Sequence, residues 1–190
     1  MTGTRATLLE RVRDPRDREA WDEFFALYAP LLEGYARASG LARNDAEEVR
    51  DQCLEVLARK LPEFEYERAR GSFQAWLHRM ARGKVIDLLR ARKVRKCESV
   101  ALERLDAPEP GPDEHWEREW RAEHLRYALS LVRRDEPEER FRAFELLLVE
   151  GLSVAEVAER TGLQATQIYK LKAALLKKVR AVLERLGTGA

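Results

Sequence analysis

Apolar residues recur at helical spacing along most of the 190-residue chain, and no segment shows the alternation of apolar and polar positions that a half-buried strand requires. Leu8, Leu9 and Val12 predict a short first helix. A longer second helix is predicted between Trp21 and Tyr35, where aromatic and aliphatic residues repeat every three or four positions. The pattern therefore predicts an all-α protein.

Two more helices are predicted in the first half of the chain. The third is capped by Asn44 or Asp45 and runs to about Lys60, because Pro62 cannot continue a helix. The polar segment EFEYERARGS then predicts a loop, and Ser72 caps a fourth helix directly after it.

The segment 97–112 predicts a linker, since LDAPEPGPDE places three prolines and a glycine within ten residues. Helix resumes near Asp113, Pro137 ends it, and three more helices are predicted after that proline. We therefore expect two small helical domains, residues 1–96 and 113–190, joined by a Pro-rich linker.

Composition limits the class of protein. Hydrophobic residues make up 45% and charged residues 36%, which is typical of a globular chain. Lys and Arg total 35 against 34 Asp and Glu, so the formal net charge is only +1. A protein that bound DNA by charge alone would be more basic than this chain. Cys53 and Cys97 have no CxxC partner and no His at zinc spacing, so we expect reduced thiols, no metal and no cofactor. The absence of a membrane-length apolar run and of a signal-peptide core predicts a cytoplasmic protein.

The segment GLSVAEVAERTGLQATQIYKLKAALLKKVR predicts a helix-turn-helix. Ser153 caps a short helix, and Ala158 supplies the small side chain that two crossing helices need. Gly162 follows at the turn, where positive φ is expected, and Ile168 anchors the second helix in the core. A plain helical hairpin with solvated lysines is the alternative, but the three-point spacing and the basic face favour binding to the major groove.

The second helix of this motif has two faces. The predicted buried stripe is Ile168, Leu171, Leu175, Val179, Val182 and Leu186. The predicted DNA-binding face is Thr166, Gln167, Tyr169, Lys170, Ala173, Ala174 and Lys177, with Tyr169 shared between core and DNA.

The third helix also has two faces. Ala46, Val49, Cys53, Val56 and Leu57 are predicted to be buried. Glu48, Asp51, Gln52 and Glu55 form one exposed polar stripe, which would be an ordinary solvated face if it stood alone.

The fourth helix ends in a basic run, with six positive residues between Lys84 and Lys96. Aromatic and basic residues alternate upstream of it, a composition suited to single-stranded nucleic acid, where bases stack and phosphates are neutralised. The predicted strand-binding residues are Arg70, Ser72, Phe73, Trp76, Arg79, Arg82, Lys84, Arg90 and Lys93. The three His residues, at positions 78, 115 and 124, are expected to be structural or on the surface.

Two segments resemble the bacterial sigma factors of the extracytoplasmic-function (ECF) type, in the sigma-70 family. DAEEVRDQCLEVLARKLPEF with GSFQAWLHRMARGKVIDLLRARK resembles the family's second conserved region, and FRAFELLLVEGLSVAEVAERTGLQATQIYKLKAALLKKVR its fourth. The opening segment LLERVRDPRDREAWDEFFALYAPLL and the pair VEGLSVAEVA with IYKLKAALLKKVR most resemble a subgroup abundant in planctomycetes and similar bacteria.

The resemblance implies a partner for each surface. The stripe on the third helix would dock on the clamp coiled coil of the polymerase β′ subunit, and the C-terminal domain would meet the β flap. The loop 63–72 and the fourth helix would capture unpaired bases of the promoter −10 element, and the helix-turn-helix would bind the −35 element. The linker would thread through the polymerase channels, and an anti-sigma protein, a kinase or the level of synthesis would supply control, since no further domain is expected after the last helix.

This sequence departs from the family pattern at two positions. The family usually has Gln where this chain has Asp51, and often has Asn where this chain has Gly83. In relatives that Asn helps to line the base pocket, so the Gly83 departure concerns how −10 bases are recognised, while Gln52 stands next to Asp51.

Alternatives from other classes are a stand-alone helix-turn-helix regulator, an enzyme acting on nucleic acid and a sigma-like protein that binds polymerase without initiating. Without clustered carboxylates, a phosphate loop or dimerisation heptads, the first two are disfavoured.

Overall fold

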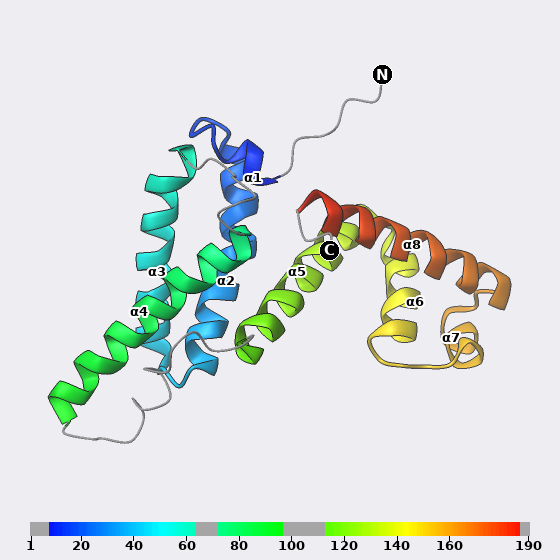
Figure 1. Cartoon of the computed structure of the whole chain (residues 1–190). Coiled ribbons are helices and arrows are strands. Elements are labelled where there is room, and N and C mark those ends of the chain that lie inside the picture. The colour runs from blue at the N-terminus through cyan, green and yellow to red at the C-terminus, as the bar shows by residue number, and fades with distance from the viewer. Residues whose placement is uncertain (1–7, 64–71, 97–112, 187–190) are drawn as a thin grey trace. The chain divides into compact units, whose positions relative to one another are not determined.

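The computed structural model describes residues 8–63, 72–96 and 113–186, and these residues form helices and turns with no strand among them (Figure 1). The elements are α1 Leu8–Arg11, α2 Arg18–Ala38, α3 Arg43–Lys60, the 3-10 turn η1 Leu61–Glu63, α4 Phe73–Lys96, α5 Glu114–Arg134, α6 Glu138–Leu148, α7 Val154–Thr161 and α8 Ala165–Arg185. The predicted all-α class is confirmed.

The described chain divides into two compact units, Leu8–Glu123 and residues 124–186. The division lies inside α5, so the first half of this helix packs with the N-terminal helices and the second half with the C-terminal ones. The predicted linker, residues 97–112, lies outside the described residues, as does the loop 64–71. The domain boundaries placed at that linker stay a prediction.

The N-terminal unit is built on α2, against which α1, α3 and α4 pack. One apolar stripe at helical spacing explains this packing, because its side chains are almost completely removed from water. The stripe comprises Phe24, Leu27, Tyr28, Leu31, Leu32 and Tyr35. It meets Ala46, Val49, Cys53 and Leu57 of α3 and Phe73, Leu77, Ala81 and Val85 of α4. Burial of the Cys53 thiol raises its pKa to about 12, so it is a core side chain.

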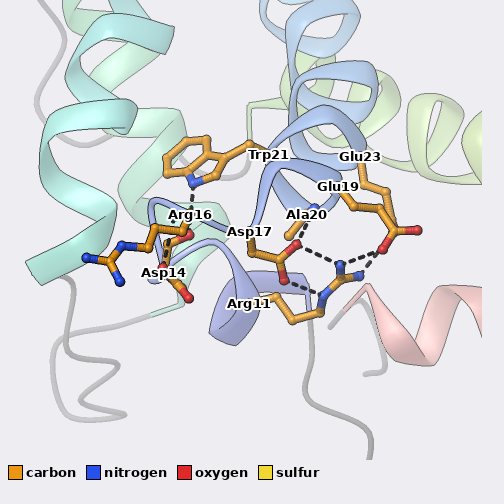
Figure 2. Close-up of polar contacts among 8 residues, drawn as sticks. All are labelled: Arg11, Asp14, Arg16, Asp17, Glu19, Ala20, Trp21 and Glu23. Carbon is orange, nitrogen blue, oxygen red and sulfur yellow. Dashed lines mark hydrogen bonds and ion pairs between the residues drawn. The ribbon is translucent and has the colours of Figure 1, made fainter.

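An arginine fixes α1 to the start of α2 (Figure 2). Arg11 donates two hydrogen bonds to the carboxylate of Asp17, both of 3.0 Å, one to Glu23 at 3.1 Å and one to Glu19 at 3.3 Å. Asp17 also accepts the backbone N–H of Ala20 at 2.9 Å and so caps α2. The hydrogen bonds from Arg11 and Ala20 lower the pKa of Asp17.

The caps of α3 and α4 differ from each other. Ser72 caps α4 as predicted, since its hydroxyl accepts the N–H of Ala75 at 3.2 Å. The prediction for α3 is wrong: the helix begins at Arg43, and its N-cap residue Ala42 makes no side-chain hydrogen bond. Asp45 lies inside the first turn, where its carboxylate forms an ion pair with Arg92 of α4 instead of capping.

The C-terminal unit packs α6, α7 and α8 against one another and against the second half of α5. Its core contains Ala128, Val132, Phe141, Ala143, Phe144, Leu146, Val157, Ile168, Leu171, Leu175 and Val179. These helices pack closely because nearly every core side chain comes from one face of its own helix. Among the described residues, no helix has the length and apolar character needed to cross a bilayer.

Candidate nucleic-acid and protein interfaces

The turn between α7 and α8 has the geometry that the sequence predicts. Ser153 and Glu156 form a reciprocal capping box, in which the Ser153 N–H donates to Glu156 at 2.8 Å and the Glu156 N–H donates to the Ser153 hydroxyl at 3.3 Å. Gly162 follows α7 with a φ of 70° and donates its N–H to the Ala158 carbonyl at 2.9 Å. Positive φ is costly for residues other than glycine, so Gly162 sets the direction of the turn.

Helix α8 separates core from surface almost as predicted. Ile168, Leu171, Leu175, Val179 and Leu186 are buried, whereas Val182 is only partly buried. On the other face, every predicted DNA-binding side chain is exposed: Thr166, Gln167, Tyr169, Lys170, Ala173, Ala174 and Lys177. Tyr169 is 60% exposed, so the expected share in the core is wrong and the ring is available to a partner. The structure thus brings this whole set onto one solvent-facing surface.

The predicted stripe on α3 is on the surface, but it is less negative than the sequence suggests. Asp51 accepts a hydrogen bond from Arg50 at 2.8 Å, and the same arginine bonds Glu33 of α2 at 2.9 Å. Gln52 is half-buried and donates its amide to Glu48 at 2.9 Å. Glu55 is exposed. The full negative charge of the stripe therefore lies with its two glutamates. On the opposite face, Val56 is half-buried and not fully buried as expected.

The predicted strand-binding residues of α4 differ in exposure. Arg79 and Arg90 are exposed, and Trp76, Arg82 and Lys84 are half-buried. Ser72 is exposed and uses its hydroxyl for the cap. Arg70 lies outside the described residues, as does the side chain of Lys93.

Phe73 requires a correction. Its side chain is only 4% exposed, and its ring packs 5.4 Å from Tyr28 and 6.2 Å from Phe24, centroid to centroid. A ring enclosed in this way cannot stack on a base, so Phe73 is a core residue here. It supports Trp76, whose ring lies 5.7 Å from its own.

Sequence reasoning missed a polar contact that ties α5 to the N-terminal helices. Asp113 accepts a hydrogen bond from the Tyr35 hydroxyl at 2.8 Å, and the same oxygen lies 3.1 Å from Nε2 of His78. Its other oxygen caps α5 by accepting the N–H groups of His115 and Trp116, at 3.1 and 3.2 Å. An Asp directly before a helix is a sequence signal for the cap. No local signal indicates its other partners, since Tyr35 lies 78 residues and His78 lies 35 residues before Asp113.

Burial alone would raise the pKa of Asp113, but the hydrogen bonds from Tyr35, the Trp116 N–H and His78 lower it below the ordinary value. Trp116 covers this contact: it is 2% exposed, stacks on His78 at 5.0 Å and meets the Tyr35 ring edge-on at 5.2 Å. His78 is therefore structural, as predicted.

The other two histidines differ in burial. His124 is buried and His115 is exposed, in line with the expectation for both. Within the described ranges, no three His, Cys, Asp or Glu side chains are grouped so that they could hold a metal ion. The surfaces that remain as candidates are those of α3, α4 and α8, which suit binding partners.

Comparison with known proteins shows which family this chain resembles. The family model described as Sigma-70 region 2 matches residues 24–95, from α2 into α4. The chain is 28% identical to the ECF RNA polymerase sigma factor RpoE of Cereibacter sphaeroides, over 94% of this chain and 91% of that protein. It is 32% identical to the ECF RNA polymerase sigma factor SigF of Caulobacter vibrioides, over 90% and 87%. It is 25% identical to the ECF RNA polymerase sigma factor SigE of Mycolicibacterium smegmatis, over 86% of this chain and 60% of that protein.

Proposed function

The chain belongs to the family of ECF RNA polymerase sigma factors, and from this premise we propose that it binds core RNA polymerase and directs transcription initiation through promoter −10 and −35 elements. It is an initiation factor and not an enzyme. The observation that supports the proposal most is the exposed polar and basic face of α8. This face stands in a chain that is similar to two sigma factors over at least nine-tenths of its length.

We propose that the polar stripe of α3 contacts the β′ clamp coiled coil. Charge complementarity steers such an encounter and fixes its register. Among the described residues, no cation pairs with Glu48 or Glu55, whereas Arg50 already neutralises Asp51. The two glutamates would therefore contribute more to clamp binding than Asp51, with Gln52 holding Glu48 in place.

The surface of α4 is proposed to bind the unpaired strand of the −10 element. Half-buried Trp76 presents part of its ring for stacking, and Arg79, Arg82, Lys84 and Arg90 supply positive charge along the same helix. Phe73 has no contact role in this proposal, because it is enclosed by α2. A Cβ added at Gly83 would have no neighbouring atom within 4 Å, so the packing there does not itself require a glycine.

Further proposals concern DNA, partners, regulation and the place of the chain within the family. The exposed face of α8 would bind the −35 element, while the C-terminal unit would meet the β flap. Regulation would come from an anti-sigma protein that competes with the polymerase for these surfaces, and the protein would act in the cytoplasm with the polymerase. The similarity of the first two helices to a subgroup abundant in planctomycetes is proposed as the closer relationship, and a phylogeny of the family would test it.

Transcription with bacterial core polymerase tests the proposed function. The protein should co-elute with core and yield promoter-specific run-off transcripts, and Glu55→Lys should weaken core binding more than Asp51→Lys. Glu47→Lys is the matched control, because it makes the same charge change on α3 but its partner is Arg43. Lys170→Ala should reduce −35 use and leave core binding intact.

Failure to bind core would refute the proposal. Tight and saturable binding to a duplex operator without polymerase would instead favour a stand-alone regulator. A protein that binds core but gives no transcript from any promoter would be a sigma-like factor that does not initiate.

A further inference from the structure

In the first turn of α8, the carboxamide oxygen and nitrogen of Gln167 differ in their hydrogen bonding. The Oε1 atom of Gln167 accepts the backbone N–H of Gln164 at 2.8 Å. A backbone N–H can only donate, so the carboxamide atom facing it must be the oxygen. The amide nitrogen Nε2 is then left with two N–H donors, and no described residue accepts from it. Gln167 is exposed, so these donors face solvent.

The same chain offers a direct comparison in α7. Glu156 occupies the equivalent third position of that helix and accepts the N–H of Ser153 at the same 2.8 Å. Its hydrogen bonds to Ser153 lower the pKa of the carboxyl. A carboxylate is the stronger acceptor and its charge is favourable at a helix N-terminus. Helix α8 uses a neutral amide instead, and its first turn has no acidic residue at all.

What the amide gains over a carboxylate is donor capacity. Lys170 lies three residues further along α8, on the same face, and its ammonium group can only donate. Neither side chain has an ion-pair or hydrogen-bond acceptor among the described residues. The leading edge of α8 therefore offers donors from both side chains, while the one amide oxygen faces the helix's own backbone.

We propose that Gln167 donates from Nε2 to a hydrogen-bond acceptor of the promoter duplex while its Oε1 keeps the cap of α8. The cap uses one of the two lone pairs of that oxygen and fixes the orientation of the carboxamide, with both N–H donors of Nε2 on the solvent side. Acceptors are present as O6 and N7 of guanine, O4 of thymine and the phosphate oxygens. This inference rests on the proposed binding of α8 to the −35 element.

The test uses holoenzyme reconstituted from core polymerase and the full chain, with promoters randomised in the −35 element. Gln167→Glu keeps the oxygen that accepts the Gln164 N–H and removes both donors. It should keep or raise the thermal stability of the protein while lowering −35-dependent transcription by roughly 5- to 50-fold, within the range of one lost base contact. Glu156→Gln makes the reciprocal change in α7 and should leave −35 preference unaltered.

Modified promoters then identify the acceptor. A promoter with 7-deazaguanine lacks the N7 acceptor of that guanine. If this change lowers transcription by the wild type but causes no further loss with Gln167→Glu, the contact is assigned to guanine N7. The same result with a methylphosphonate in place of a phosphate assigns the contact to that phosphate. Either result supports the donor role. Unchanged −35 use by Gln167→Glu would overturn it. A wild-type holoenzyme indifferent to the −35 sequence would refute the proposed role of α8 itself, and the inference with it.

Discussion

Replacing Asp113 by Asn should destabilise the N-terminal unit by about 1.5–3 kcal/mol, the range for losing hydrogen bonds to a charged group. The oxygen Oδ2 accepts from Tyr35 at 2.8 Å and lies 3.1 Å from His78 Nε2, and Asn puts a neutral amide there. The cap of α5 depends on Oδ1, which Asn retains. Asp113→Ala removes both functions and should cost about 1 kcal/mol more.

Urea unfolding followed by tryptophan fluorescence measures this effect. All four Trp residues of the chain lie in the N-terminal unit, at positions 21, 76, 116 and 120, so the signal reports on that unit alone. A double-mutant cycle with Tyr35→Phe isolates the contact, because Phe keeps the packing of the ring and removes only the hydroxyl. The two substitutions should be less than additive, with a coupling energy of about 0.5–3 kcal/mol. Simple additivity would show that the hydroxyl and the carboxylate do not interact.

The contribution of Asp113 also depends on pH with a defined sign. Its pKa is lowered from 3.8 in the folded protein, so the folded state favours the carboxylate. The stabilisation is therefore fully present above pH 3.8 and is lost as the pH falls through the folded pKa. The stability difference between wild type and Asp113→Asn should shrink as the pH falls below 3.8. A difference that grew over that range would refute this account.

Three other substitutions or reagents test the fold around the candidate surfaces. Gly162→Ala should destabilise the C-terminal unit by about 1–2 kcal/mol in thermal unfolding, because its φ is 70°, and no loss would mean that the turn rearranges. Phe73→Ala should cost about 3–5 kcal/mol as a core truncation, and a stable variant that has lost only −10 binding would restore its contact role. Cys53 should resist alkylation at pH 8 in the folded protein, since burial raises its pKa to about 12, and it should react when urea unfolds the N-terminal unit. Rapid native labelling in a Cys97→Ser background would contradict its burial.

Much of the fold follows from local sequence. Ser153 with Glu156, Gly162 after α7 and Ser72 before α4 act on backbone groups no more than four residues away, so their roles could be predicted from spacing. The stripe of α8 is also local, because helical periodicity fixes which side chains share a face. The helices, the helix-turn-helix and the exposed set on α8 were therefore determined by the sequence itself.

Contacts between distant helices needed the tertiary structure. Phe73 stands among basic residues in the sequence, yet the helix that it starts packs it against α2. Arg50 forms an ion pair with Asp51 and so offsets part of its charge. Asp45 pairs with Arg92 instead of capping α3. Even adjacent residues such as 50 and 51 have several rotamers, and only the surrounding helices select one.

The difference has a physical cause. Periodicity and caps involve groups whose separation is set by the covalent chain, so the sequence alone determines them. Burial of a particular ring, pairing of a particular charge and the contact of Asp113 with Tyr35 depend on how helices far apart in sequence pack together. Only the tertiary structure decided which predicted surface residues stay on the surface, and which of the charges there are already neutralised.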